Sequence, residues 1–315
     1  MTNYSHIPVL RDAAIRMLAP RAGGVYLDGT FGGGGYAKAI LDSAACSLFA
    51  IDRDPAAVHR AHEFAKDYPN RFTICEGRIS NLSSLLEACG ARELDGAVFD
   101  LGVSSYQIDD PARGFSFRAD GPLNMQMGSS GLDAAQLVNF CTESELADIL
   151  FKYGDEKAAR KIAKVIIERR KTQKFETTSD LAGVIRSVVR PDKSGIDPAT
   201  RSFQALRIAV NEELSDIEAA LVQAADLLAP GGRLVVVSFH SLEDRIVKQF
   251  FAAETGRAPG ASRHNPAGML RQTKPRFSLV TKAAVGPDDA EMRANPRARS
   301  AKMRVMERLG ERLAA

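Results

Sequence analysis

Four consecutive glycines, Gly32 to Gly35, follow the apolar segment 25–27 and the acidic residue Asp28. This order predicts a strand that ends in a glycine-rich turn and opens a helix, where bare backbone can approach a ligand closely. A flexible linker is rarely bordered by an apolar strand and an amphipathic helix. We therefore interpret the glycine run as part of a binding site.

The type of ligand depends on the acid in front of the glycines. The spacing Gly32-x-Gly34-x-x-Ala37 satisfies the dinucleotide fingerprint, so a nicotinamide or flavin cofactor is one alternative. However, the Asp28 carboxylate would repel a pyrophosphate, which favours helix-terminal N–H groups and positive charge. The same carboxylate suits the ammonium group of an amino-acid-bearing cofactor such as S-adenosylmethionine.

Two further acids end predicted strands. Asp52 closes the apolar segment 48–51, at the distance where a carboxylate accepts hydrogen bonds from ribose hydroxyls. Asp100 closes the segment 94–99 and precedes a loop that contains Ser104 and Ser105. Because open α/β sheets bind ligands beyond the carboxyl ends of their strands, we expect Asp28, Asp52 and Asp100 to face one crevice.

Short apolar runs alternate with helical patterns in the first hundred residues, which is typical of a parallel α/β sheet. The expected strands are 24–28, 47–52, 71–76, 94–100 and 233–239, with helices around 35–43, 55–66 and 80–89. A long helix over 203–228, a Pro230-Gly-Gly turn and an apolar strand follow in the order common in class I methyltransferases. Segments 276–282 and 300–307 predict an antiparallel edge. The predicted fold is therefore an α/β, Rossmann-like class I methyltransferase sheet.

An all-helical domain is predicted within this sheet domain. No strand pattern occurs between Asp100 and Arg233, and Thr142-x-x-Glu145 has the form of a capping box before a helix. A second helix follows over 158–166, and Thr178-Ser179-Asp180 could cap a third. We expect a methyltransferase domain formed by 1–105 and 206–315, and an inserted substrate-recognition domain over 106–205.

Composition narrows the class of protein. The chain has 315 residues, of which 45% are hydrophobic and 26% charged, enough for a large core. No apolar run approaches the ~20 residues that cross a bilayer, and the N-terminus does not resemble a signal peptide, so we expect no membrane partner and a cytoplasmic location. Four scattered cysteines predict reduced thiols. His59 and His62 have no accompanying cluster, so no metal site is expected.

Basic charge is concentrated at the C-terminal end. Residues 256–315 contain thirteen Lys/Arg against five Asp/Glu, a net +8, whereas the preceding residues carry 29 against 34, a net −5. Such asymmetry is expected of a surface that contacts phosphates, although a solvated basic tail would have the same composition.

Seven motifs along the chain carry a specific resemblance. They are His6-Ile-Pro-Val-Leu10, Asp28-Gly-Thr-Phe-Gly32, Ala50-Ile-Asp-Arg-Asp-Pro55, Asp100-Leu-Gly-Val-Ser-Ser105, Arg113-Gly-Phe-Ser-Phe117, Ser238-Phe-His-Ser-Leu-Glu-Asp-Arg245 and Asn295-Pro-Arg-Ala-Arg-Ser-Ala-Lys302. Together they closely resemble the bacterial small-subunit (16S) rRNA cytosine-N4 methyltransferase family, RsmH or MraW. The match runs from about His6 to Leu309 in one order.

The resemblance implies methyl transfer from S-adenosylmethionine to N4 of a cytidine in the decoding region of 16S rRNA, within the small ribosomal subunit. It places the cofactor positions of the family on Gly34, Gly35, Tyr36, Asp52, Ile79, Asp100 and Gln107, to which the residue pattern adds Asp28. The chain also departs from the family. Tyr36 replaces a common His, Gly33 a usual Arg and Tyr106 a common Pro, and Asn124 and Gln126 replace an expected Asp and Arg. Backbone contacts at position 36 are therefore expected without a side-chain contact.

The chemistry requires positioning more than a strong base. A cytidine amino nitrogen is a poor nucleophile, so acceptors must hold its hydrogens while the methyl group is aligned. We expect Asp100 and Ser104 to position the acceptor. The cytidine must be unstacked, and the residues expected to contact RNA are Arg113, Phe115, Arg201, His240, Arg245, Arg297, Arg299, Lys302 and Arg304.

Two other functions remain open at this point. An NAD-linked oxidoreductase would use the dinucleotide fingerprint, and a non-catalytic ribosome-assembly factor would keep the fold without the reaction. The sequence also leaves open whether the protein is a monomer or a homodimer.

Overall fold

The sheet is the framework of the first part of the protein. The computed structural model describes residues 8–191, 195–257 and 274–310, so His6 and Ile7 of the first motif lie outside the described residues, as do parts of the basic C-terminal region. Seven strands form one sheet in the order β3-β2-β1-β4-β5-β7-β6. They are β1 (Val25–Asp28), β2 (Ser47–Asp52), β3 (Phe72–Glu76), β4 (Leu94–Asp100), β5 (Leu228–Ser238), β6 (Phe277–Leu279) and β7 (Lys302–Arg308).

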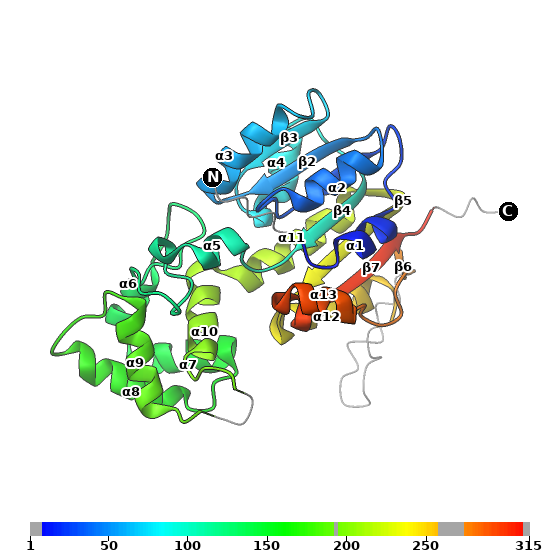
Figure 1. Ribbon diagram of the computed structural model, residues 1–315. Helices are drawn as coiled ribbons and strands as arrows, with labels where there is room; N and C mark the ends of the chain where they lie inside the picture. Colours follow the sequence, from blue (N-terminus) through cyan, green and yellow to red (C-terminus); the bar gives the residue numbers. More distant parts are fainter. Residues whose placement is uncertain (1–7, 192–194, 258–273, 311–315) are drawn as a thin grey trace. The chain divides into compact units, whose positions relative to one another are not determined.

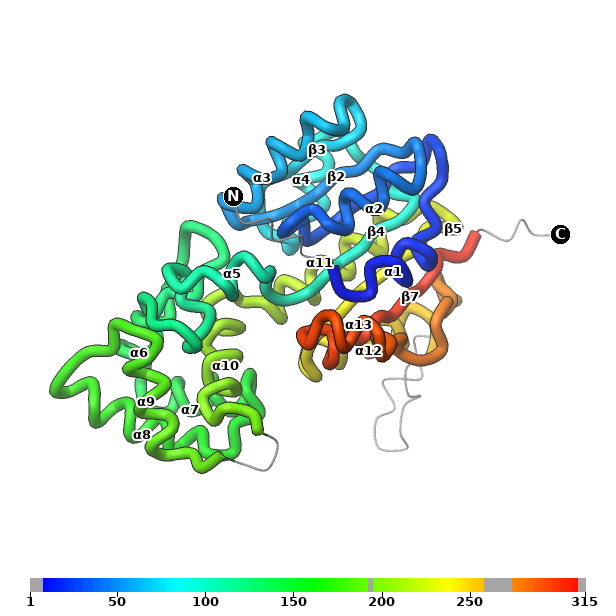
Figure 2. The backbone as a smooth tube through the Cα atoms, viewed as in Figure 1, coloured from blue at the N-terminus to red at the C-terminus, as the bar shows by residue number. Residues whose placement is uncertain are grey.

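The pairing pattern confirms the predicted fold class. The strands β1 to β5 pair in parallel, and β7 pairs antiparallel with both β5 and β6. Figure 2 shows the red C-terminal strand β7 returning into the sheet. Each predicted strand overlaps an observed one, and β2, β4 and the second half of β5 are apolar runs whose side chains are mostly buried. The predicted Pro230-Gly-Gly turn lies within β5, which begins at Leu228.

Helices cover both faces of this sheet (Figure 1). On one face, α1 (Arg11–Leu18), α2 (Gly35–Ser43) and α3 (Pro55–Ala65) bury a cluster that includes Leu18, Ile40 and Ala61. On the other face, α4 (Leu82–Ala88), α11 (Glu213–Leu227) and α12 (Ser241–Glu254) bury Leu86, Leu221 and Phe251. Within the described parts of the chain, no helix has the length and apolar character needed to cross a membrane.

Short elements complete this unit, which comprises residues up to Gly102 and from Leu214 onward. They are the 3-10 turn η1 (Ile79–Asn81), the helix α13 (Asp289–Ala294) and the 3-10 turn η4 (Pro296–Ser300). Segments far apart in the sequence meet here, because the Leu10 backbone N–H donates to Glu291 Oε1 of α13 at 2.5 Å. The C-terminal segment therefore supports the N-terminal one.

The second compact unit spans Val103–Glu213 and is helical. It contains α5 (Ser105–Asp109), the 3-10 turn η2 (Pro111–Arg113), α6 (Ala134–Phe140), α7 (Glu143–Gly154), α8 (Ala159–Arg170), α9 (Thr178–Val188) and α10 (Thr200–Asn211). The predicted capping box of Thr142 and Glu145 is present at the start of α7. A separate apolar core, which includes Leu146, Ile162 and Leu206, holds these helices together.

Two expectations about helices were wrong. The predicted helix over 203–228 is two helices, because Glu212 adopts a left-handed conformation (φ 53°) at the end of α10. The buried Asn211 side chain favours this break, since it donates to Met125 O (2.7 Å) and accepts from Met127 N (2.8 Å). The cap of α9 is Thr177, whose hydroxyl accepts from the Asp180 N–H, rather than Thr178.

The cysteines also differ from the expectation of free thiols. Cys75 on β3 and Cys89 after α4 are joined as a disulfide, whereas Cys46 and Cys141 are free. The spacing of the two cysteines carries no signal for this pair, because they meet only through the packing of α4 beside β3.

Gly29 offers a test of the packing at the end of β1. A Cβ atom at Gly29 would lie 2.2 Å from Cε1 of Phe99, which is buried in the sheet. We expect Gly29→Ala to lower the free energy of unfolding by about 1–3 kcal/mol, the usual cost of overpacking a core, as measured by urea denaturation.

The matched control is Gly286→Ala in the same unit. A Cβ atom at Gly286 would meet only Ala301 O at 3.9 Å, an ordinary contact, so its unfolding midpoint should stay close to that of the wild type. Equal midpoints for the two variants would contradict the packing argument.

Candidate active site

The site lies where the strand order of the sheet reverses. The chain runs outward from β1 to β2 and β3 on one side, and then returns to β4 on the other side of β1. Ligands of open α/β sheets bind at such a reversal, beyond the carboxyl ends of the strands. Asp28 ends β1, Asp52 ends β2 and Asp100 ends β4, so the fold brings the three predicted acids to one edge.

The glycine-rich loop connects β1 to α2. Gly34 has φ +77° and caps α2 without a side chain, and its N–H donates to Phe31 O at 2.7 Å. A Cβ atom at Gly35 would lie only 2.2 Å from Cγ of Pro8. The loop is therefore tightly turned, and side chains are excluded at the two positions assigned to cofactor binding.

Asp28 is fully buried at the centre of this edge. Its Oδ1 accepts from the Thr30 N–H (3.1 Å), but its Oδ2 is enclosed and has no hydrogen-bond partner among the described residues. Burial, together with the nearby Asp52 carboxylate, raises the pKa of Asp28 from 3.8 to about 7. Such a group would be stabilised by a cation from outside the chain.

Asp100, at the end of the neighbouring strand β4, is a second acid with an enclosed carboxyl oxygen. Its Oδ1 is enclosed without a hydrogen-bond partner in the part of the chain that the structure describes. Burial, followed by the charges of Asp28 and Glu243, raises the pKa of Asp100 well above its usual value. Its backbone N–H donates to Thr30 Oγ1 at 2.7 Å, so Thr30 links the ends of β1 and β4. The sequence analysis missed Thr30, although it stands within the Asp28-Gly-Thr-Phe-Gly32 motif.

Asp52 has a structural task as well as the predicted ribose contact. Its Oδ2 accepts from the Gly32 N–H (2.8 Å), and its Oδ1 accepts from the Asp54 N–H (2.9 Å). Burial raises the pKa of Asp52 despite these two bonds. Each carboxylate oxygen can accept more than one hydrogen bond, so the ribose contact stays compatible with this geometry.

Tyr36 is turned into the core. Its hydroxyl donates to the backbone carbonyl of Val9, and burial raises its pKa well above the usual value. The Tyr36 hydroxyl is thus engaged by protein, and the expected backbone contact of position 36 with the cofactor stays a prediction. Ile79 begins the turn η1 after β3 and is partly buried against the sheet core.

Ser104 and Gln107 belong to the helical unit and form a capping box. The Ser104 hydroxyl accepts from the Gln107 N–H (3.3 Å), and the Gln107 side-chain oxygen accepts from the Ser104 N–H (3.0 Å). These contacts start α5. They give the two side chains a structural explanation that the sequence analysis did not include.

Glu243 is a further buried acid that the sequence analysis did not assign. Its Oε2 accepts from the backbone N–H groups of Phe239 (2.7 Å) and His240 (3.2 Å). The His240 Nε2 lies 3.0 Å from Glu243 Oε1, and its Nδ1 accepts weakly from the Glu243 N–H. Glu243 could have been found from the sequence, because the spacing His240-x-x-Glu243 is that of a capping box.

The aromatic and basic residues expected to contact RNA fall into two groups. Phe115 is buried in the core of the helical unit, with the Arg113 guanidinium 5.7 Å from its ring centre. Arg113 also donates to the carbonyls of Gln126 and Met127. This environment argues against base stacking on Phe115 and gives Arg113 a packing role.

The remaining cations are closer to solvent. Arg201 on α10, Arg245 on α12, and Arg297 and Arg299 in η4 are exposed. Lys302 and Arg304 on β7 share the carboxylate of Asp244, at 3.2 and 2.7 Å. These side chains remain candidates for phosphate contacts.

The sequence was then compared with known proteins. The MraW methylase profile matches residues 3–309. The chain belongs to the MraW methylase family. It is 63% identical over 306 residues to "Ribosomal RNA small subunit methyltransferase H" of Acidiphilium cryptum, covering 97% of this chain and 98% of that protein. A protein of the same name from Granulibacter bethesdensis is 55% identical over 304 residues, covering 96% and 91%.

A crystal structure of an rRNA methylase from Streptococcus thermophilus aligns with this methylase at 10% identity and a TM-score of 0.41, covering 95% of this chain and 94% of that one.

The methyl donor of this methylase is S-adenosylmethionine, and the residues of the site fit it. The donor carries an ammonium and a sulfonium group, and the enclosed oxygens of Asp28 and Asp100, which have no hydrogen-bond partner among the described residues, belong to carboxyl groups that can ionise to pair with such cations. The glycine-rich loop follows Asp28 directly, and Phe31 and Pro8 occupy the space that side chains at Gly34 and Gly35 would need.

The raised pKa of Asp28 predicts how stability depends on pH. In the folded protein Asp28 keeps its proton up to about pH 7, whereas its usual pKa is 3.8, so the group costs stability as pH rises through this interval. A shift from 3.8 to about 7 corresponds to roughly 4 kcal/mol. Without added cofactor, Asp28→Asn should match the wild type near pH 4 and exceed its free energy of unfolding by up to this amount above about pH 7.

Urea denaturation of both proteins across this pH range would measure the difference. Glu87→Gln, which alters an exposed acid on α4, is the control and should follow the wild type at every pH. A difference between Asp28→Asn and the wild type that does not change with pH would contradict the argument.

Proposed function

We propose that this methylase transfers a methyl group from S-adenosylmethionine to N4 of a cytidine in the decoding region of 16S rRNA, in the small ribosomal subunit. The observation that carries the proposal is the pair of buried, unpartnered carboxyl oxygens of Asp28 and Asp100, on adjacent strands of a methylase of this family. Relatives named as small-subunit rRNA methyltransferases, up to 63% identical over nearly the whole chain, support the choice of RNA.

The two acids have different tasks in this proposal. Asp28, together with the backbone at Gly34 and Gly35, binds and orients the amino-acid end of the donor, which supplies a methyl group on a positively charged sulfur. Asp100 faces the acceptor. Its carboxyl oxygen accepts a hydrogen bond from the cytidine amino group, which orients the nitrogen lone pair toward the methyl group.

Proton transfer follows from the chemistry of the acceptor. The amino nitrogen becomes acidic once it is methylated, so a strong base is unnecessary. The raised pKa of Asp100 makes this carboxylate able to take the proton that the nitrogen releases. Glu243 lies close enough to raise that pKa, and it also holds the backbone of Phe239 and His240.

The helical unit is proposed to recognise the RNA substrate. It carries exposed cations such as Arg201, and its residues form a core separate from that of the sheet. With ribosomal RNA as substrate, the protein would work in the cytoplasm.

The direct test is incubation of the protein with S-adenosylmethionine and small ribosomal subunits that lack the modification, followed by mass analysis of nucleosides. N4-methylcytidine should form with the wild type. Asp100→Asn should lower the rate by about 100-fold or more, since the variant cannot take the proton and carries no negative charge. Glu87→Gln is again the matched control and should retain the wild-type rate.

The outcomes separate the alternatives. RNA binding without methylation by the wild type would favour a ribosome-assembly factor and overturn the proposed reaction. Full activity in Asp100→Asn would leave the reaction in place and overturn the task assigned to Asp100.

Cofactor affinity should depend on the protonation of Asp28. Because its pKa is about 7 in the free protein, binding of a cationic donor should weaken as pH falls below 7, by up to tenfold per pH unit. Isothermal titration of S-adenosylmethionine between about pH 5.5 and 8.5 would measure this dependence. Asp28→Asn should bind more weakly at high pH and lose most of the dependence, whereas an unchanged pH profile would contradict the role of Asp28.

A further inference from the structure

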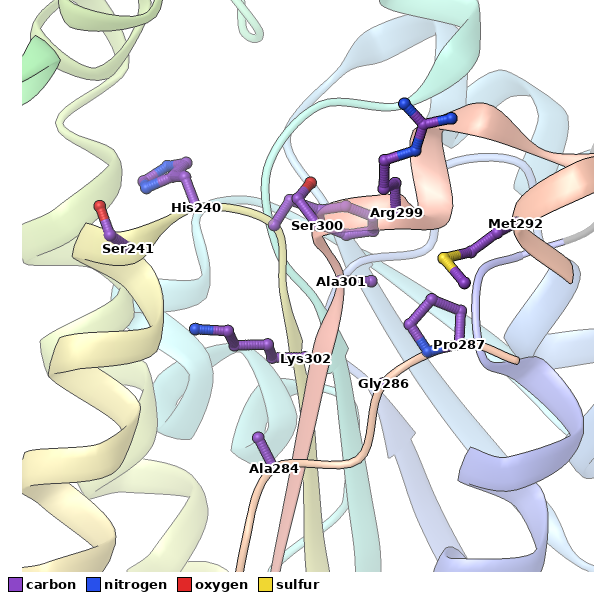
Figure 3. A pocket seen from close by; sticks show the side chains of 11 residues that line it. His240, Ser241, Ala284, Gly286, Pro287, Met292, Arg299, Ser300, Ala301 and Lys302 are labelled. Carbon is purple, nitrogen blue, oxygen red and sulfur yellow. The ribbon is translucent and has the colours of Figure 1, made fainter. Parts of the chain in front are cut away.

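A pocket of about 660 Å³ lies on the sheet unit, and its lining does not include the glycine-rich loop (Figure 3). It is formed where β5 ends and β7 begins, together with the start of α12 and the segment around α13. His240 and Ser241 lie on one side, Pro287 and Met292 lie on the opposite side, and the start of β7 runs between them. Its volume is in the range of sites for small organic ligands.

The polar part of the pocket is positively charged. Lys302 shares the Asp244 carboxylate with Arg304, so two cations face one acid. Burial opposes ionisation of Asp244, but hydrogen bonds from Arg304 and Lys302 outweigh it and lower its pKa. Arg299, also in the pocket wall, is exposed and forms no ion pair with any residue that the structure describes. The pocket therefore offers excess positive charge to an anion.

The apolar part of the pocket is suited to a flat ring. Pro287, Met292 and Phe239 contribute apolar side chains to its lining. The His240 ring is held in one orientation by its contacts with Glu243. Single-stranded nucleic acids are bound by this combination of cations for the phosphate and planar or apolar groups for the base.

The pocket is close to the proposed acceptor position. Asp100 on β4 pairs with Val237 on β5, and Ser238 on β5 pairs with Lys302 on β7. Neighbouring strands are about 4.8 Å apart, so the pocket begins one to two strands from Asp100. It lies on the side of β4 opposite to β1 and β2, where the donor is proposed to bind.

We propose that this pocket binds a nucleotide of single-stranded RNA that flanks the methylated cytidine, with its phosphate at Arg299 and Lys302 and its base against Met292 and Pro287. The proposal rests on the proposed function, because it takes the acceptor to be RNA at Asp100. An RNA strand that occupies the pocket fixes the register of the cytidine before methyl transfer. The pocket is thereby a specificity site distinct from the donor site.

The test measures binding of a labelled single-stranded RNA of about ten nucleotides that contains one cytidine, by fluorescence anisotropy with the full chain. Arg299→Ala should weaken binding by about 3- to 10-fold and lower the slope of log affinity against log salt by about 0.7, the value for one phosphate contact on a single strand. Its affinity for S-adenosylmethionine should not change.

A second variant fills the pocket without loss of charge. Gly286→Leu places a side chain at a position where a Cβ atom meets only Ala301 O at 3.9 Å, so the backbone tolerates it. It should weaken RNA binding by about tenfold, because a base can no longer enter, while the salt slope stays closer to that of the wild type. Arg293→Ala, an exposed arginine on α13 outside the pocket lining, is the matched control and should change neither quantity.

The results distinguish this proposal from the proposed function. Equal effects of Arg299→Ala and Arg293→Ala, or full RNA binding by Gly286→Leu, would overturn the pocket assignment even if the wild type methylates cytidine. Competition by an acidic peptide but not by cytidine monophosphate would overturn it in favour of a protein partner. If pocket variants lose RNA binding while the wild type fails to form N4-methylcytidine, the pocket is supported and the reaction is overturned.

Discussion

The burial of three carboxyl groups at the carboxyl ends of adjacent strands is the constraint on which the sheet unit depends. Asp28, Asp52 and Asp100 are drawn to one edge by the parallel pairing of β2, β1 and β4. Each has a raised pKa because burial disfavours its charge. A fold selected only for stability would replace such groups with apolar ones, so their presence is explained by a positively charged ligand that the chain does not supply.

These three acids differ in how many of their carboxyl oxygens accept a hydrogen bond from the protein. Asp52 is held by two backbone N–H groups and supports the glycine-rich loop, whereas Asp28 and Asp100 each retain an enclosed oxygen without a partner. In the sheet unit, Asp52 and the glycine-rich loop are therefore held in place by hydrogen bonds, whereas Asp28 and Asp100 can become charged when a cation binds. The free-energy cost of burying a charged group therefore falls on Asp28 and Asp100, where a bound cation can offset it. The glycine-rich loop stays preorganised.

The sequence was sufficient to predict the sheet and the acids at its strand ends, because both follow from local apolar runs that terminate in a carboxylate or in glycine. The sequence was insufficient where a contact with a residue distant in the chain determines the local structure. Asn211 breaks the long helix through contacts with Met125 and Met127, and Cys75 meets Cys89 only after α4 has packed. Phe115 likewise looked available for stacking, but its burial depends on helices that follow it in the chain.

The return of strand β7 has a consequence for the order in which the sheet unit forms. The strand β7 inserts beside β5, and Glu291 of α13 binds the backbone of Leu10, so segments far apart in the sequence close this unit. Until β7 pairs, β5 has an unpaired edge, and the unit lacks the wall that Arg299 and Lys302 provide. Because pairing between segments so distant in sequence is slow, the proposed RNA pocket would be completed late in folding.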